Sequence, residues 1–548
     1  AQDVAVNGQT SLTIVLQEDA EVLEEVVVIG YGTVKKNDAT GSVLAIRPDE
    51  QNKGFVTSAQ EMMQGKIAGV SVTSSSGAPG AGSTIRIRGG SSLNASNDPL
   101  IVIDGLQMSS EGTKGLSNPL SLVNPADIES FTVLKDASAT AIYGSRGSNG
   151  VILITTKKGK NGAAPKVTYN GNVSFSANPK TIKVMTGDEF RSFVRNYFGA
   201  DSDQAKLLVT ASTDWQKEIY RLGVGTDHSV TLTGGFANMP YRGNVGYTNN
   251  NVTLKTSNFE RFTASVNLNP SFLNNHLKFN IMGKYMLAYT RYANTEAIGA
   301  AVAMDPTKPV TTSATAFKHY AGYWQWTQGS SLNDSEYPTQ WNTQATKNPV
   351  SLLDLNRDRA RSQNFMGNLE VEYKIHGLED LVLHATASGE WAWGKQNRVT
   401  SYMSPQAFYY GWEGWEKKDN YNLQLNAYAH YSKDFYKDKN HIDIMAGYEW
   451  AHYHSKETWD GWGTYRGSNN DVTKRNQKYN YTTPLPGEWE HYLVSFFGRL
   501  NYGFLNRYLF TATVRYDGTS RFKKHWGLFP SAAFAWKIKE EPFLRDVR

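Results

Sequence analysis

NPADIESFTVLKDASATAIYGSRGSNGVILITTKKG, residues Asn124 to Gly159, is the stretch that decides the fold of this chain. Asn124 is a favourable helix N-cap and Pro125 suits the first helical position, so a short helix is expected to begin here. Asp127 would then lie near the positive end of the helix dipole. The run from Phe131 to Leu134 predicts a strand directly after this helix.

A second helix and a second strand follow in the same stretch. Asp136 is expected to cap a helix of small residues from Ala137 to Tyr143, which Gly144 ends. The next strand, Val151 to Ile154, is apolar on both of its faces. Because such strands are normally covered on both sides, the pattern predicts a compact β-α-β unit with almost no exposed sheet.

A preceding segment, MQGKIAGVSVTSSSGAPGAGSTIRIRGGSSLNASNDPLIVIDG (Met63 to Gly105), has the same short strands and turns. Together the two segments resemble the plug domain of the SusC/RagA family of TonB-dependent outer-membrane transporters. The resemblance is carried, in chain order, by QGKIAGV, SGAPG, IRIRG, NDPLIVIDG, NPADIES, VLKDASATAIYGSRGSNGVI and TTKKG. So many matching words in one order and at close spacing make the resemblance highly specific.

The composition excludes several classes of protein. Among 548 residues, 56 Lys and Arg stand against 51 Asp and Glu, and no basic run stands out, so nucleic acid is a poor partner. The absence of cysteine rules out disulfides, thiolate zinc sites and cysteine nucleophiles. No apolar run is long enough for a transmembrane helix. The composition is compatible with a transmembrane β-barrel, because the alternating strands of a barrel give a low mean hydropathy. The mean hydropathy of this chain is -0.49.

From Lys160 onward the sequence alternates polar and apolar residues, as RFTASVNLN (Arg261 to Asn269) and YNLQLNAYAHY (Tyr421 to Tyr431) illustrate. About twelve such segments are expected, many near the length that a tilted strand needs to cross a bilayer. Their polar faces suit a wet lumen. Members of the family close about 22 strands around the plug. An open sheet edge is not viable in lipid, so we expect the N-terminal part of a longer barrel.

The expected fold is thus a mixed α/β plug domain inside a large antiparallel transmembrane β-barrel. Residues 1–19 contain the strand pattern TSLTIVL and resemble the end of the family's N-terminal Ig-like domain. Residues 20–36 would form a TonB box and linker, residues 37–160 the plug, and residues 161–548 the N-terminal part of the barrel. Two short helices, from Thr186 to Gly199 and from Thr213 to Gly223, are expected to pack as structural elements.

EEVVVIG, an acidic pair before a β-branched run, is the expected TonB-binding site. Such a segment favours an extended conformation, and an extended peptide can add itself to the edge of another protein's sheet. It resembles the TonB box of the family. The alternative is an ordinary strand of the preceding domain. The TonB-binding residues are Glu24, Glu25, Val26, Val27, Val28, Ile29 and Gly30.

Two sets of residues are candidates for contact with a substrate. Arg86 and Arg88 alternate with apolar residues on one predicted strand, and we favour their pairing with polar groups of the barrel wall over contact with substrate. Aromatic clusters in three predicted loops could stack on sugar faces, or belong to the interface girdle, or pack against a lid protein. These aromatic residues are Tyr323, Trp324, Trp326, Tyr409, Tyr410, Trp412, Trp415, Trp459 and Trp462.

No catalytic constellation or cofactor motif emerges from the sequence. GAPGAG, Gly77 to Gly82, has neither the spacing of a dinucleotide fingerprint nor the lysine of a phosphate loop. His452 and His454 would lie on one side of a strand, but no carboxylate pattern adjoins them, so a metal site is not expected. The chain is therefore not expected to be an enzyme or to carry a cofactor or metal.

The resemblance implies an active importer in the outer membrane of a Gram-negative cell. It implies work with a SusD-like surface lipoprotein, and import when TonB, driven by its inner-membrane motor proteins, pulls on the plug. Oligosaccharide is the favoured substrate, oligopeptide is the second choice, and a dimer of the two-protein unit is possible. The alternatives of another class are a passive or structural barrel and a secreted β-rich glycan-binding protein or hydrolase.

Overall fold

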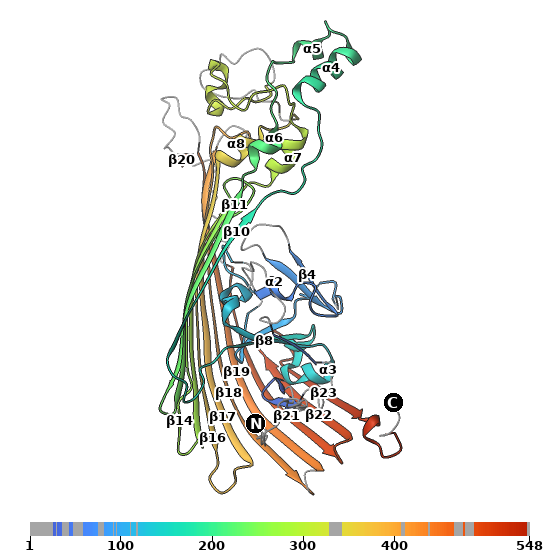
Figure 1. The fold of residues 1–548 in the computed structure, drawn as a ribbon, viewed down its shortest axis with the longest axis vertical. Coiled ribbons are helices and arrows are strands. Elements are labelled where there is room, and N and C mark those ends of the chain that lie inside the picture. Colours follow the sequence, from blue (N-terminus) through green and yellow to red (C-terminus); the bar gives the residue numbers. More distant parts are fainter. Residues whose placement is uncertain are drawn as a thin grey trace, which may run out of the picture.

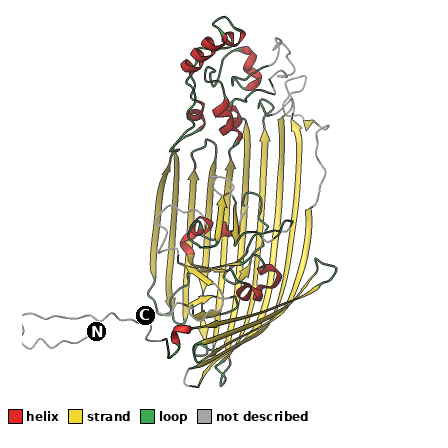
Figure 2. Ribbon diagram, turned by 90° about the vertical axis from the view of Figure 1, so that its right-hand side faces the viewer, coloured by secondary structure: helices red, strands yellow, loops and turns green. Residues whose placement is uncertain are grey.

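A small α/β domain lies against the concave face of a long, curved antiparallel sheet in the computed structural model of this chain (Figure 1). Helices gather beyond one end of the sheet (Figure 2). The structure describes residues 26–28, 30–35, 43–47, 59–74, 82–90, 92–94, 96–109, 111–116, 119–327, 342, 344–406, 411–436, 439–464, 475–476 and 487–544. The strand predicted within residues 1–19 lies outside this part of the chain.

The α/β domain is built on a five-stranded sheet with the order β3-β8-β9-β6-β7. The predicted strand pair is present, but β8 and β9 run antiparallel to each other, and the parallel partner of β9 is β6. The helical turn between β8 and β9 therefore folds the chain back instead of crossing over the sheet. The strands are β3 (Val43–Ile46), β6 (Leu100–Ile103), β7 (Leu106–Gln107), β8 (Ile128–Leu134) and β9 (Val151–Thr156).

The local signals around β8 and β9 are confirmed in part. The Asn124 side chain accepts a hydrogen bond from the Ala126 N–H at 3.0 Å and caps the one-turn helix η3 (Pro125–Asp127). Strand β8 begins at Ile128 and not at Phe131. The predicted second helix is divided into α3 (Ala137–Thr140) and the 3-10 segment η4 (Ala141–Gly147), with a kink at Gly144.

The core of the α/β domain lies on both sides of β9, as its apolar sequence predicts. Val151 and Ile152 are fully buried. Ile85 and Ile87 of β5 (Ser83–Ile87) are buried in the same hydrophobic cluster as Ile152. Strand β5 pairs with β4 (Val70–Ser74) in a separate two-stranded sheet. The remaining described elements of this domain are β1 (Val26–Val28), β2 (Thr33–Lys35), α2 (Ala59–Met63) and η2 (Pro119–Leu122).

The large sheet has twelve described strands along its main path, in agreement with the predicted number, and every neighbouring pair on this path is antiparallel. Two short strands, β14 (Ser271–Phe272) and β20 (Arg475–Asn476), pair beside this path. The path consists of β10 (Lys166–Ser176), β11 (Gly223–Phe236), β12 (Met239–Asn251), β13 (Asn258–Leu268), β15 (Leu277–Tyr292), β16 (Asn356–Lys374), β17 (Leu381–Thr400), β18 (Gly411–Phe435), β19 (Asn440–Thr464), β21 (Gly487–Phe504), β22 (Tyr508–Thr519) and β23 (Trp526–Trp536).

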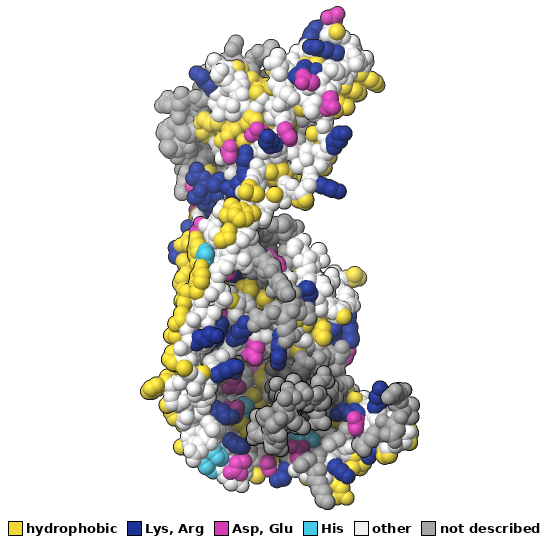
Figure 3. All heavy atoms as spheres, in the orientation of Figure 1, with side chains coloured by type: hydrophobic (Ala, Val, Ile, Leu, Met, Phe, Trp, Pro, Cys, Tyr) yellow, Lys and Arg dark blue, Asp and Glu magenta, His cyan; other side chains and the backbone are white. Residues whose placement is uncertain are grey.

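The two faces of this sheet differ in chemistry, as the alternation predicts. On β13, Phe262 and Val266 are exposed on the outer face, whereas Arg261 and Thr263 are buried on the inner face, which contacts the α/β domain. Hydrophobic side chains form a band along the outer side of the strands (Figure 3). A polar inner face and an apolar outer face are typical of a transmembrane barrel.

The two ends of the sheet differ as well. Short turns join the strands at one end, and the long connections with their helices lie at the other (Figure 2). The same asymmetry, with short periplasmic turns and longer extracellular loops, is typical of outer-membrane barrels. None of the described helices is both long and apolar enough to cross a membrane. The helices of the long connections are α4 (Gly187–Phe198), α5 (Asp203–Lys206), α6 (Trp215–Ile219), α7 (Glu296–Ala303), η5 (Thr315–Tyr320) and α8 (Pro349–Asp354).

Helix α4 begins with the predicted capping box, since Glu189 N–H donates to Thr186 Oγ1 at 3.3 Å and Thr186 N–H donates to Glu189 Oε2 at 2.8 Å. Its expected role as a packing helix is only partly correct. Val194 is buried, but Phe193 and Tyr197 of the same apolar stripe are exposed. By contrast, α6 buries Trp215 and Ile219 against α7 and α8, as a structural helix should.

Buried ion pairs fix the α/β domain to the inner face. Lys284 of β15 donates to Asp104 at 2.6 Å, and Arg242 of β12 donates to Asp127 at 2.8 Å. Asp104 also accepts from the N–H of Thr156 at 2.8 Å and from its hydroxyl at 2.7 Å. Burial disfavours the Asp104 carboxylate, but Lys284 outweighs this effect and holds the pKa of Asp104 below its usual value. The Asp104 carboxylate therefore stays charged at neutral pH.

Candidate functional site

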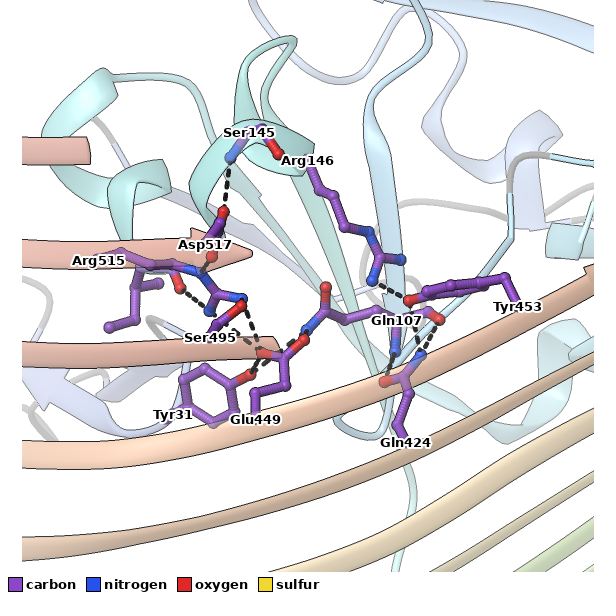
Figure 4. Close-up of polar contacts among 11 residues, drawn as sticks. Tyr31, Gln107, Ser145, Arg146, Gln424, Glu449, Tyr453, Ser495, Arg515 and Asp517 are labelled. Carbon is purple, nitrogen blue, oxygen red and sulfur yellow. Dashed lines mark hydrogen bonds and ion pairs between the residues drawn. The ribbon is translucent and has the colours of Figure 1, made fainter. Parts of the chain in front are cut away.

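Tyr31, directly after the predicted TonB box, lies between the α/β domain and the sheet (Figure 4). Its hydroxyl donates a hydrogen bond to the carboxylate of Glu449 on β19, 418 residues away in the sequence. Gln107 of β7 donates to the other oxygen of this carboxylate at 2.9 Å. Two groups from the N-terminal part of the chain therefore bind one buried carboxylate of the sheet.

The charge of Glu449 is balanced by Arg515 of β22. Both Nη atoms of Arg515 lie 3.1 Å from Glu449 Oε2, and Nε donates to Asp517 at 2.6 Å. The Nη2 atom also donates to the Ser495 hydroxyl of β21 at 2.8 Å. The side chains of Arg515 and Glu449 are 0% and 1% exposed. An unpaired buried charge costs several kcal/mol of folding free energy. The hydrogen bonds of Arg515 and Glu449 are therefore what makes their burial stable.

The same two residues of β22 hold η4 of the α/β domain. Arg515 Nη1 donates to the Ile142 carbonyl oxygen at 2.6 Å, and the Ser145 N–H donates to Asp517 Oδ2 at 3.3 Å. The backbone at Gly144 approaches this pair closely. Gly144 has a φ of +58°, which glycine adopts without strain. A Cβ atom at this position would overlap the Asp517 carboxylate and lie 2.9 Å from Arg515 Nε.

A second polar group extends this contact. Gln424 of β18 accepts from the Gln107 N–H at 3.1 Å and donates to the Gln107 carbonyl oxygen at 2.5 Å. Gln424 also donates to the Tyr453 hydroxyl of β19 at 3.3 Å. Arg146 of η4 donates to the same hydroxyl and stands over the Tyr453 ring, 4.7 Å from its centroid. We call the group of Tyr31, Gln107, Arg146, Gln424, Glu449, Tyr453, Ser495, Arg515 and Asp517 the locking network.

Aromatic rings surround Tyr31. Its ring stacks on Phe497 of β21 at 4.7 Å between centroids and meets Tyr428 of β18 edge-on at 5.5 Å. Tyr143 of η4 lies 6.1 Å away. Burial and the neighbouring Glu449 carboxylate raise the pKa of the Tyr31 phenol well above its usual value. Tyr31 therefore remains protonated and acts as a hydrogen-bond donor at physiological pH.

The locking network can hold two parts of the protein together, but it is not arranged for catalysis or metal binding. Its carboxylates are fully engaged by arginine, tyrosine and amide donors. Throughout the described residues, no group of three or more His, Asp or Glu side chains is placed to hold a metal ion. Its chemical role is to bury matched charges at the contact.

The predicted TonB box is partly described. Val26–Val28 form β1, which pairs with β2 in a hairpin, with Val27 opposite Val34. Gly30 lies in the turn with φ at +78°, and a Cβ atom there would lie 2.8 Å from Ile142 Cγ2 of η4. The box therefore adjoins the locking network directly. Glu24, Glu25 and Ile29 lie outside the described residues.

Arg86 and Arg88 were expected to pair with the barrel wall, but among the described residues their ion pairs lie elsewhere. Arg86 forms an ion pair with Asp98, and Arg88 lies 2.5 Å from Asp136, so both pair within the α/β domain. The acidic residues come from turns that the predicted strand pattern did not place beside β5. Contact of either arginine with a substrate stays a prediction.

The first aromatic cluster packs among helices. Tyr323, Trp324 and Trp326 are half-buried against the core that α6, α7 and α8 form. Lys308 Nζ lies 5.0 Å and 4.8 Å from the ring centroids of Trp324 and Trp326. The Tyr323 hydroxyl donates to Asp354 at 2.7 Å. These contacts give the rings structural partners, and a role in ligand binding stays a prediction.

Four other aromatic residues were expected in loops, but the structure places them in strands. Trp412 and Trp415 belong to β18, and Trp459 and Trp462 belong to β19, because these strands are 25 residues long and continue beyond the predicted ends. Trp412 and Trp459 share the inner face with the residues that contact the α/β domain, whereas Trp415 is on the outer face. Tyr409 and Tyr410 lie outside the described residues.

His452 and His454 have carboxylate neighbours that the sequence pattern did not reveal. Glu490 and Glu488 of β21 lie 3.2 Å and 3.1 Å from the Nε2 atoms of His452 and His454, respectively. Each carboxylate contacts its own histidine, and the four residues form no metal group. The pairing comes from the register of two strands, which a single sequence segment cannot show.

Sequence reasoning missed the locking network. Arg146 lies within a motif that carries the family resemblance, VLKDASATAIYGSRGSNGVI, but the resemblance gives its side chain no role, and Arg515 lies outside the seven motifs. The glycine at position 144 was a usable signal, because it interrupts a segment with helical character directly after the bulky Tyr143. Nothing local marks Glu449 or Tyr31.

Replacing Gly144 by Ala should displace η4 of the α/β domain from the sheet, because the added methyl group would overlap the Asp517 carboxylate. We expect η4 to become sensitive to protease in the folded protein. Gly299→Ala is the matched control, since a Cβ atom at Gly299 of α7 meets nothing within 4 Å. Equal protease resistance of the two variants would contradict this account of the contact.

Comparison with known proteins agrees with this architecture. Residues 35–151 match the TonB-dependent receptor plug domain. The chain is 54% identical to the TonB-dependent receptor SusC of Bacteroides thetaiotaomicron over all of this chain and 54% of that protein. It is 34% identical to the TonB-dependent receptor P3 of Formosa agariphila over all of this chain and 52% of that protein.

The fold is similar to that of the RagAB peptide importer in its open-open state, with a TM-score of 0.72 at 23% identity. This match covers 93% of the present chain and 58% of that one. The chain spans about half the length of the curated relatives it matches, which are TonB-dependent receptors and not enzymes. With its plug domain and the curved antiparallel sheet against which that domain lies, the chain belongs to the SusC/RagA-like TonB-dependent receptors.

Proposed function

We propose that this chain acts in the active, TonB-dependent import of oligosaccharides across the outer membrane, together with a SusD-like surface lipoprotein. The observation that carries the proposal is the 54% identity to SusC over the whole chain. TonB-dependent receptors are outer-membrane β-barrels, and the polar inner face and apolar outer face of the sheet suit that location.

Oligopeptide is the second candidate substrate. RagAB is a peptide importer with the same fold, but at 23% identity the likeness concerns the fold alone. The identity to SusC is more than twice as high, and flat aromatic rings on the inner face suit sugar stacking. Mass spectrometry of the molecules that co-purify in the lumen separates the two candidates.

We infer that the locking network keeps the plug in place until TonB pulls. The box in β1 and Tyr31 are separated by only the turn at Gly30, so tension on the box reaches Tyr31 first. Withdrawal of Tyr31 removes one donor from Glu449 and the ring from Phe497. Arg515 and Asp517 still hold η4 at that stage.

The order of these contacts gives the proposal a physical basis. Leaving a buried charge without its partner costs about 3 to 5 kcal/mol, so thermal motion alone rarely opens the contact. A force applied at the box can break the contacts one after another, because each lies further along the chain from the point of pulling. The buried pairs of Asp104 and Asp127 with the sheet would hold the rest of the plug in place.

Deletion of Glu24 to Gly30 should abolish uptake and leave surface binding of the substrate intact. Val27→Pro is a sharper variant, because proline removes an N–H that an added TonB strand would need. Its matched control is Val34→Pro, which disturbs the same hairpin from the opposite strand. Normal uptake by the deletion variant, or equal loss in Val27→Pro and Val34→Pro, would rule out the box assignment.

Replacing Trp412 and Trp459 by Ala should weaken substrate binding, since both lie on the inner face. Loss of one stacked ring typically costs about 0.5 to 1.5 kcal/mol beyond the buried area, so a loss of severalfold to about a hundredfold is expected for two. Calorimetry on the purified full-length protein measures this loss. Trp415→Ala on the outer face is the control, and equal affinities in all variants would remove the ligand role.

A further inference from the structure

A cluster of arginines on the outer face has no role in the transport mechanism. Arg291 is at the end of β15, and Arg357 and Arg359 are at the start of β16. The residues that alternate with them face the plug, since the Ser362 hydroxyl donates to the Lys114 carbonyl oxygen and Ala360 lies against Gly115. The three guanidinium groups therefore lie on the opposite side, which faces away from the lumen.

The strand register places like charges side by side. Arg291 is directly opposite Arg359 across the β15–β16 pair, and Arg357 is two residues further along the same face. Like charges in directly opposed positions destabilise a sheet. In the next row, Arg361 stands over the ring of Tyr289, 5.7 Å from its centroid, and lies opposite Lys395 of β17.

The chain supplies little compensation for this charge. Within the described ranges, no carboxylate lies within 4 Å of Arg291, Arg357 or Arg359. Asp354 is the acidic residue that acts on Arg291 through its charge, and it already binds the Tyr323 hydroxyl. By register, Glu260 is opposite Tyr289 and Glu413 is opposite Val399. On the inner face, by contrast, Arg398 is paired with Asp358 at 3.3 Å and with Glu416 at 2.9 Å.

The cluster lies at the rim of the apolar band. Tyr289, Phe365 and Trp393 are exposed on the same outer face, one to three rows closer to the middle of the sheet. Figure 3 shows Lys and Arg side chains gathered where the strands meet the helical part, directly above the hydrophobic band. This end carries the long connections, so the cluster lies at the level of the outer-leaflet head groups.

We propose that Arg291, Arg357 and Arg359 bind a phosphate group of an anionic glycolipid in the outer leaflet. Guanidinium groups bind phosphate oxygens in pairs, and an anion between Arg291 and Arg359 would relieve their repulsion. The apolar band below the cluster offers a surface for the acyl chains, which a free phosphate ion would not use. The inference rests on the membrane orientation that accompanies the proposed function.

The test uses the full-length protein in detergent and lipid A that carries two phosphate groups as the probe, with binding measured by native mass spectrometry. The double variant Arg291→Gln and Arg359→Gln should bind roughly thirtyfold more weakly, since each basic residue contributes about a fivefold factor near an anionic surface. Lys166→Gln, at the opposite end of the sheet, is the matched control and should bind like the wild type.

Two further measurements distinguish the source of the phosphate. Dephosphorylated lipid A should bind weakly to every form of the protein, and millimolar inorganic phosphate should not displace the lipid. Equal binding of the dephosphorylated lipid, displacement by inorganic phosphate, or an unchanged affinity in the double variant would each overturn the proposal. Arg359→Lys, which keeps the charge but loses paired contacts, should show an intermediate affinity.

Controls for folding and for transport distinguish a loss of lipid binding from misfolding and from a loss of uptake. Each variant should keep the unfolding temperature of the wild type, since Arg291 and Arg359 are on the outer face, Lys166 is exposed, and none of the three forms an ion pair among the described residues. Deletion of the TonB box should leave lipid binding unchanged. Failure of lipid binding with normal TonB-dependent uptake would refute this inference alone, and the reverse result would refute the import proposal alone.

Discussion

The buried pair of Glu449 and Arg515 is the interaction on which the plug contact depends. It lies in the sheet, yet its remaining hydrogen-bonding capacity is directed to the plug, through the Tyr31 hydroxyl, the Gln107 amide and the Ile142 carbonyl oxygen. A buried charge pair is stable only when these groups are satisfied. The sheet therefore requires the plug in order to bury its own charges, and the plug is held where those charges lie.

This arrangement links the sequence to a mechanism of opening. The β-branched run of the proposed TonB box is followed by a glycine turn and then by Tyr31, so the segment that we propose TonB pulls leads directly into the locking network. Gly144 brings the backbone of η4 against Asp517, which no other residue would allow. Packing and charge thus hold the plug against the sheet, and in the proposed mechanism the force from TonB opens this contact.

Local patterns in the sequence predicted much of the fold. The Asn124 cap, the Thr186 and Glu189 capping box, the doubly buried β9 and the alternation of the sheet are all encoded within a few residues, and each is present. The locking network joins residues 418 positions apart, and the pairing of His452 with Glu490 depends on strand register. Such contacts arise only after the sheet has formed, so a single sequence could not predict them. The prediction that Trp412 and Trp459 lie in loops was wrong, because their strands are longer than a bilayer requires.

The most direct measurement is the force needed to withdraw the N-terminal segment from the full-length transporter in a lipid bilayer, pulled at Val26. Tyr31→Phe removes only the hydroxyl that reaches Glu449, and Tyr436→Phe, at an exposed turn, is the matched control. The account predicts a lower rupture force for Tyr31→Phe and the wild-type force for Tyr436→Phe. An unchanged force in Tyr31→Phe would contradict the claim that this segment is held by the buried charge pair.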